Sequence, residues 1–125
     1  MIATEEKTAT GFNFEQNENQ RMIEQMVRDF GKQHIAPYIM EWDEKQYFPV
    51  EMFKELGKLG LMGVLVPAEY GGSGFGYFEY VTAIKELGKI CGGVALSMAA
   101  HNSLCTGHIL QFANEEQKRK YLPKL

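Results

Sequence analysis

The sequence lacks the features that mark nucleic-acid-binding and membrane-spanning proteins. Its formal net charge is −3, and basic and acidic residues are mixed along the chain, so it has no basic stripe for nucleic acid. No apolar run approaches the ~20 residues that cross a bilayer. Residues 1–13 are polar and contain no apolar core of a signal peptide. We therefore expect no nucleic-acid partner, no membrane span and a cytoplasmic location.

Cysteine is scarce, which argues against a disulfide framework. Cys91 and Cys105 form no CxxC pair, and without an export signal they are expected to be reduced thiols. His101, Cys105 and His108 share one helix face, but three ligands on one straight helix cannot easily surround a tetrahedral ion. The sequence therefore predicts no metal site.

What is present is an ordinary globular composition. The 125 residues are 45% hydrophobic and 23% charged, which fits one domain with a real core. We predict a flexible tail over residues 1–13 and one folded domain over residues 14–125.

Apolar residues recur at helical spacing along most of the chain. The first helix is predicted from about Phe14 to Ile35, with Asn13 and Gln16 as its capping pair and Pro37 ending it. A short helical continuation over 39–43 is possible, and a second helix is predicted with Pro49 in its first turn.

The second half continues the helical pattern. A strong stripe runs from Tyr77 to Cys91, Gly92-Gly93 breaks it, and the segment 94–112 is apolar on nearly all sides. Asn114 and Gln117 predict a capping box for a last helix. The fold class is therefore all-α, a helical bundle of about five to six helices.

A glycine cluster at 71–76 follows the short apolar run 64–66, which we expect to be extended because Pro67 disfavours helix before it. Tyr77 stands where a dinucleotide fingerprint needs its last glycine, and no Lys-Ser or Lys-Thr follows for a Walker loop. We interpret the cluster as a tight reversal with glycines at positive φ.

No arrangement of side chains in the sequence indicates catalysis. Glu69 is expected in the loop and Glu86 on the polar face of its helix, where solvated carboxylates are common. Neither Ser97 nor Ser103 lies in a GxSxG context. We therefore assign no catalytic residue.

Several segments together resemble the N-terminal helical domain of the acyl-CoA dehydrogenases. The likeness runs from Asn17 to Leu125 and rests on the order and spacing of the matches rather than on any one of them. The family's Pro-Glu-Glu-Tyr-Gly-Gly-x-Gly loop is matched with alanine in place of the first glutamate. The matching segments are Ile35-Ala36-Pro37, Glu41-Trp42-Asp43, Phe48-Pro49, residues 53–63, residues 67–74, His101-Asn102-Ser103-Leu104 and residues 114–123.

The resemblance implies a flavoprotein oxidoreductase of fatty acid metabolism built from three parts. These are this helical domain, a β-domain that binds most of the FAD, and a C-terminal helical domain that carries the catalytic glutamate in most members. FAD is thus the implied cofactor, with fatty acyl-CoA as substrate and electron-transfer flavoprotein as partner in a homo-oligomer. The chain has neither of the other two domains, so we expect it alone to be inactive and not to retain FAD.

Matching the family's Asn-Ser-Leu onto residues 102–104 places Leu96, Ser97, Ala100 and Leu104 on one wall of the acyl pocket. The alternative for each is ordinary bundle core. No arginine lies in this segment to meet a second carboxylate, which favours a neutral acyl chain. The bulk of Leu96 and Met98 would shorten the pocket.

Two other functions remain open. An acyl-CoA oxidase or flavin monooxygenase of the same fold would differ in the missing domains. A helical interaction module without enzymatic activity would have no such domains.

Overall fold

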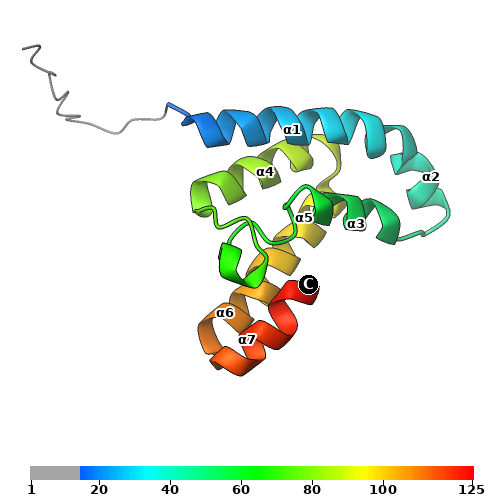
Figure 1. Cartoon of the computed structure of the whole chain (residues 1–125). Coiled ribbons are helices and arrows are strands. Elements are labelled where there is room, and N and C mark those ends of the chain that lie inside the picture. The colour runs from blue at the N-terminus through cyan, green and yellow to red at the C-terminus, as the bar shows by residue number, and fades with distance from the viewer. Residues whose placement is uncertain (1–14) are drawn as a thin grey trace, which may run out of the picture.

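The computed structural model describes residues 15–125, which fold into helices joined by turns and, between Lys58 and Tyr77, by a longer loop (Figure 1). No strand occurs within this range, and the all-helical prediction is confirmed. The predicted tail, Asn13 and Phe14 lie outside the described residues. The helices are α1 (Glu18–His34), α2 (Ile39–Glu44), α3 (Val50–Lys58), α4 (Tyr77–Ile90), α5 (Gly92–Ala100), the π-helical turn η3 (His101–Thr106), α6 (Gly107–Phe112) and α7 (Glu115–Tyr121).

The first helix begins four residues later than predicted. Its N-cap is Asn17, whose Oδ1 accepts a 2.8 Å hydrogen bond from the Gln20 amide while Gln20 Oε1 accepts one from the Asn17 amide. The pattern Asn-x-x-Gln occurs twice in succession, at 13–16 and at 17–20. The second copy also gains a tertiary contact, because Asn17 Nδ2 donates to Glu79 Oε1 of α4 at 3.0 Å.

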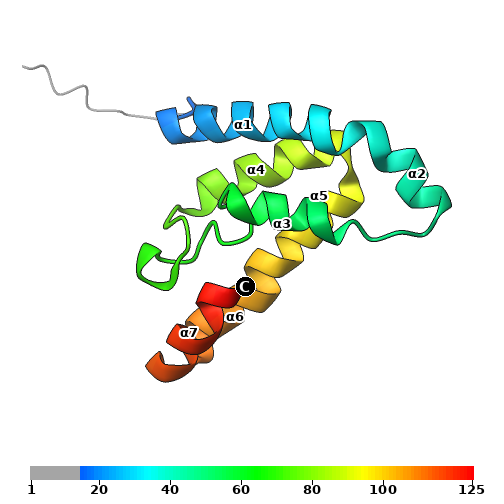
Figure 2. The same cartoon turned by 45° about the vertical axis from the view of Figure 1, so that its right-hand side comes forward.

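Helices α1 and α4 lie side by side, and α3 and α5 complete the main core (Figure 2). Gly31 permits the close approach, since a Cβ there would stand 2.0 Å from Ile90 Cδ1. Burying these apolar faces supplies the main driving force for folding. The core contains Ile23, Val27, Ile35, Met52, Leu56, Leu61, Val64, Tyr80, Ala83, Leu87, Val94, Ala95 and Met98.

Residues 64–66 are not extended, contrary to the prediction. They form turns, and the buried Val64 and Val66 face two different core clusters. The chain doubles back instead, because Gly71 and Gly74 adopt φ of 87° and 65° as predicted. Gly72 allows the tightest contact, since a Cβ there would lie 2.0 Å from the Val66 carbonyl oxygen.

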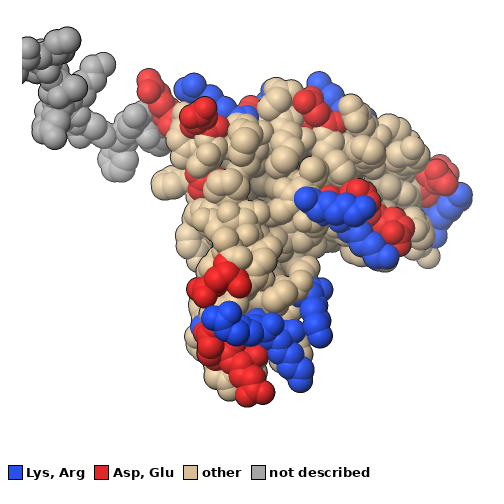
Figure 3. Space-filling view, viewed as in Figure 1, with Lys and Arg blue, Asp and Glu red and all other residues tan. Residues whose placement is uncertain are grey.

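A second, smaller cluster joins this loop to the C-terminal helices. Val66, Tyr70 and Leu122 form its buried centre, with η2 (Ala68–Tyr70) and η4 (Leu122–Lys124) as single turns of 3₁₀ helix. The predicted capping box of Asn114 and Gln117 is confirmed. Figure 3 shows acidic and basic side chains intermingled over α7 and over α3.

The break before the apolar helix falls one residue earlier than predicted. Cys91 is the extended residue, with φ −149° and ψ 113°, whereas Gly92 already begins α5. From there α5, the π turn and α6 follow one another without interruption to Phe112. No helix among residues 15–125 is both long and apolar enough to cross a membrane.

Candidate functional site

The four predicted wall residues lie together on one side of α5 and the π turn. Leu96 is 71% exposed and Leu104 is 65% exposed, while Ser97 and Ala100 are half-buried. They are therefore surface residues of this domain rather than its closed core. The Ser97 hydroxyl donates a 2.9 Å hydrogen bond to the Gly93 carbonyl, so this side chain presents no unsatisfied donor.

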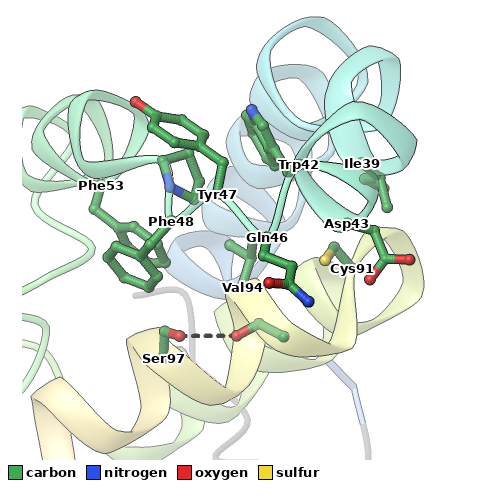
Figure 4. Close-up of a pocket in the computed structure, with 12 residues that line it drawn as sticks. Ile39, Trp42, Asp43, Gln46, Tyr47, Phe48, Phe53, Cys91, Val94 and Ser97 are labelled. Atoms are coloured by element: carbon green, nitrogen blue, oxygen red, sulfur yellow. Dashed lines mark hydrogen bonds between the residues drawn. The ribbon is translucent and has the colours of Figure 1, made fainter.

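An open cleft of about 520 Å³ lies beside this wall, between α2, the 45–49 turn, α3 and α5 (Figure 4). Ser97 lines both the wall and the cleft. Two members of its lining, Phe48 and Phe53, stack with ring centroids 4.8 Å apart. A third, Trp42, is backed by Tyr38, whose ring lies outside the lining with its centroid 5.8 Å away. No sequence pattern predicted this cleft, because its lining comes from two stretches of chain, residues 39–53 and 91–97, that only the fold brings together.

The chemistry of the cleft suits a neutral, apolar group. Aromatic and aliphatic side chains form most of its lining, and Asp43 is the one charged residue among those lining it. A lining without a cation has nothing to pair with a phosphate or carboxylate, which would lose its hydration without compensation.

Glu86 is buried, not solvated as predicted. Only 2% of it is exposed, and it lies where α4 faces α1. It accepts hydrogen bonds from Lys89 at 2.5 Å and from Arg28 at 3.3 Å, and Arg28 also pairs with Glu24. Burial alone would raise the pKa of Glu86, but these hydrogen bonds outweigh burial and hold it below the ordinary value.

This ion cluster has a structural rather than a catalytic geometry. Lys85 adds a further contact to Glu86 at 3.4 Å, so cations surround the carboxylate on α1 and α4. None of its members lines the aromatic cleft. Helical periodicity places position 86 on the inward face with Ala83 and Leu87, but it does not show that Arg28 of another helix pairs with the carboxylate.

The glycine loop does not offer a cradle for the phosphates of a flavin nucleotide. Such a cradle needs free backbone amides pointing at the ligand. Here every amide from residue 71 to 75 donates to a backbone carbonyl of the loop, and the Gly76 amide donates to Glu79 Oε2 at 3.2 Å. The loop residues thus do not fit FAD, and they serve to hold the reversal.

The histidines and cysteines also lack the arrangement of a metal site. Among residues 15–125, no three His, Cys, Asp or Glu side chains stand close enough to hold an ion. Both cysteines are free thiols. His101 Nε2 is buried without a hydrogen bond, and burial lowers the pKa of this imidazole.

Comparison with known proteins identifies a family whose N-terminal domain matches nearly all of the described residues. Residues 17–125 match the family model described as acyl-CoA dehydrogenase, N-terminal domain. The chain is 45% identical over 113 residues to the probable acyl-CoA dehydrogenase YngJ of Bacillus subtilis, covering 90% of this chain and 30% of that protein. It is 43% identical over 111 residues to the mitochondrial isovaleryl-CoA dehydrogenase of Bos taurus, covering 87% of this chain and 26% of the relative.

A solved structure shares the fold as well. Butyryl-CoA dehydrogenase from Megasphaera elsdenii superposes with a TM-score of 0.84 at 36% identity, over 90% of this chain and 30% of that one. This chain therefore spans about a third or less of the length of these relatives. The family match over nearly all described residues, together with the shared helical fold, shows that the chain belongs to the acyl-CoA dehydrogenase family and represents its N-terminal domain.

Proposed function

We propose that this domain supplies one wall of the acyl pocket in a flavin-dependent dehydrogenase that introduces a double bond between Cα and Cβ of a fatty acyl-CoA thioester. The observation that carries the proposal is the exposure of Leu96 and Leu104 on the same side as Ser97 and Ala100. Large apolar side chains standing in line on a helix are suited to cover a hydrocarbon chain.

The proposed acyl group carries no charge at its far end. No Arg, Lys, Asp or Glu occurs between Gly92 and Phe112, and the adjoining cleft contains no cation. A distal carboxylate would be left without a partner in such surroundings. A neutral chain loses only its contact with water, which favours binding.

The remaining parts of the reaction are assigned to the rest of the enzyme. The catalytic base and the binding of FAD belong to the other two domains that the family resemblance implies, since the glycine loop here does not fit the cofactor. Electron-transfer flavoprotein is the proposed electron acceptor, and a homo-oligomer the proposed assembly. The compartment is proposed to be the cytoplasm, with whose reducing conditions the unpaired Cys91 and Cys105 are compatible.

The proposal is tested by introducing a large side chain on the proposed wall, in the complete dehydrogenase that carries this domain. Ala100→Trp should reduce kcat/KM for octanoyl-CoA more than for butyryl-CoA, because a longer chain meets the obstruction first. Ala68→Trp, at an exposed position in the loop, is the matched control and should affect neither. Because overpacking can cost about 1–3 kcal/mol of stability, unfolding is measured for both variants. Equal losses for both substrates, with the fold intact, would show that Ala100 does not line the acyl pocket.

The same assay separates the alternatives. Reduction of molecular oxygen in place of electron-transfer flavoprotein would indicate an oxidase or monooxygenase of this fold. Absence of any flavin-dependent activity in the full-length protein would favour an interaction module.

A further inference from the structure

The structure assigns Asn102 as a positioning residue: its side chain holds the π turn, and the π turn keeps the acyl wall aligned. The inference rests on the proposed function, because it explains how that wall is built. Asn102 lies at the centre of the long helix that runs from α5 into α6, and it is completely buried. An asparagine has poor helix propensity and is rarely buried, so its presence there needs a specific reason.

All of the polar groups of this amide side chain are used. Its Oδ1 accepts a 2.9 Å hydrogen bond from the Val64 amide, and its Nδ2 donates to the Leu61 carbonyl at 2.9 Å and to the Met98 carbonyl at 3.1 Å. Two of these partners belong to the loop that precedes the glycine cluster. Asn102 therefore fastens the long helix to that loop, and no apolar residue could replace these contacts.

The backbone carbonyl of Asn102 also takes part in the π turn. Its carbonyl accepts the Gly107 amide, five residues further on, and also the Thr106 hydroxyl at 2.9 Å. Gly107 suits this geometry, because a Cβ there would stand 3.2 Å from the Asn102 oxygen. The Ala99 carbonyl takes hydroxyl donors from Ser103 at 2.7 Å and from Tyr80 at 3.0 Å. Side chains thus stabilise the altered backbone pairing of this turn.

The π turn changes which residues share a face. In an uninterrupted α-helix each residue turns by about 100°, so Leu96 and Phe112 would point about 160° apart. One extra residue in a wider turn reduces that difference by about 100°. The exposed fractions of the side chains are consistent with a shared outward direction: Leu96 is 71% exposed, Leu104 is 65% exposed and Phe112 is 77% exposed.

The buried side of the helix shows the same alignment. Met98, Asn102 and Thr106 are spaced by four residues and are all essentially inaccessible. In a regular α-helix the direction of the side chain would turn by about 80° from Met98 to Thr106, and one extra residue in a wider turn brings the two to within about 20°. The π turn therefore lets one row stay buried while Leu96, Ala100 and Leu104 form one outward wall.

The test combines a structural and a catalytic readout. Asn102→Leu removes the amide contacts, and Gly107→Ala crowds the Asn102 carbonyl from the other end of the turn. The control is Val27→Ala, which creates a cavity in α1, remote from the wall. Hydrogen exchange on the 125-residue chain should show the Val64 amide losing protection in Asn102→Leu but not in the control.

In the complete dehydrogenase, both turn variants should change the ratio of kcat/KM for octanoyl-CoA to that for butyryl-CoA. The expected change is about tenfold, the effect of displacing one methylene-sized contact, and it should appear mainly in KM. Val27→Ala should lower the melting temperature and leave the ratio as in the parent. If Asn102→Leu does not fold, Gly107→Ala alone decides the outcome.

Three results separate the possible failures. Lost protection at Val64 with an unchanged substrate ratio would overturn the positioning role while leaving the proposed function intact. Retained protection in Asn102→Leu would show that the side chain does not hold the turn. A parent enzyme that oxidises no acyl-CoA would overturn the proposed function and the catalytic part of this inference, whereas hydrogen exchange would still decide the structural part.

Discussion

The Tyr70 hydroxyl donates a 2.9 Å hydrogen bond to Glu115 Oε2, joining the loop before the glycine cluster to the first turn of α7. Arg119 completes the contact, with its guanidinium carbon 5.5 Å from the Tyr70 ring centroid and an ion pair to Glu115 at 2.7 Å. The hydrogen bond to Glu115 raises the pKa of the Tyr70 phenol. Tyr70, the tyrosine of the loop that resembles the family's, therefore holds this loop against α7.

We expect Tyr70→Phe to loosen the attachment of α7 without disturbing the main core. The ring stays buried, and only the hydroxyl contact is lost. Hydrogen exchange should rise first in α7, and denaturant unfolding should show a modest loss of stability. A double-mutant cycle with Glu115→Ala, which removes the acceptor, should give losses that do not add, because both changes break this one hydrogen bond. Additive losses would show that the two side chains act independently.

Gly72→Ala should be among the most damaging small substitutions in the chain. Its Cβ would meet the Val66 carbonyl oxygen at 2.0 Å, and the Val66 side chain and carbonyl carbon lie within 2.5 Å as well. Because backbone must move, we expect a loss of about 3 kcal/mol, the upper part of the range for overpacking. Denaturant unfolding measures it.

Gly92→Ala is the matched control, since an added Cβ there has nothing within 4 Å and lies at the start of α5. It should leave stability unchanged or raise it slightly. Similar losses at both positions would contradict the steric explanation.

Stability should fall in acid because of Glu86. Its pKa is lowered in the folded protein relative to the ordinary 4.5, so the unfolded chain binds the proton more readily. The contribution of this carboxylate is therefore fully present above pH 4.5 and is lost as pH falls through the lowered folded value. Glu86→Gln should cost roughly 1 kcal/mol at neutral pH, since its partners remain partly exposed, and should flatten the acid slope.

The measurement is denaturant unfolding between pH 2.5 and 7, taken as about the range over which carboxyl groups titrate. Leu87→Val, a neighbouring core change without a titrating group, should lower stability equally at every pH. An acid slope in Glu86→Gln as steep as in the parent would assign the effect to other carboxylates.

The 125-residue chain should self-associate at high concentration. Leu96, Leu104 and Phe112 stand exposed along one face, and contiguous apolar patches above a few hundred Å² are unusual on monomers. Sedimentation over a wide concentration range should reveal dimers or larger species, and Phe112→Ser should weaken them. Phe78→Ser, on α4, is the control for a second exposed apolar surface. A strictly monomeric chain that binds no hydrophobic dye would contradict the prediction.

Local sequence rules predicted most helices well. The apolar spacing located α4, Pro49 directly precedes α3, and the capping box of Asn114 and Gln117 begins α7. The glycine cluster predicted a reversal at positive φ, because glycine alone enters that region without steric cost. These features depend on neighbours within a few residues, which is why the sequence is sufficient to reveal them.

Other features depended on distant residues. Two identical Asn-x-x-Gln patterns compete for the start of α1, and the contact between Asn17 and Glu79 accompanies the one that is used. Glu86 is buried because Arg28, from another helix, reaches its carboxylate. No local pattern distinguishes these outcomes.

The sequence by itself determined that the chain is helical, where the glycine reversal and most of the helices lie, and which family it resembles, because periodicity, caps and glycine positions are local properties. The tertiary structure decided the form of the candidate site. The π turn exists where Asn102 meets Val64, 38 residues earlier, and that contact sets which side chains share a face. An asparagine in an apolar helix signals a buried partner, but only the folded chain shows which backbone group it is.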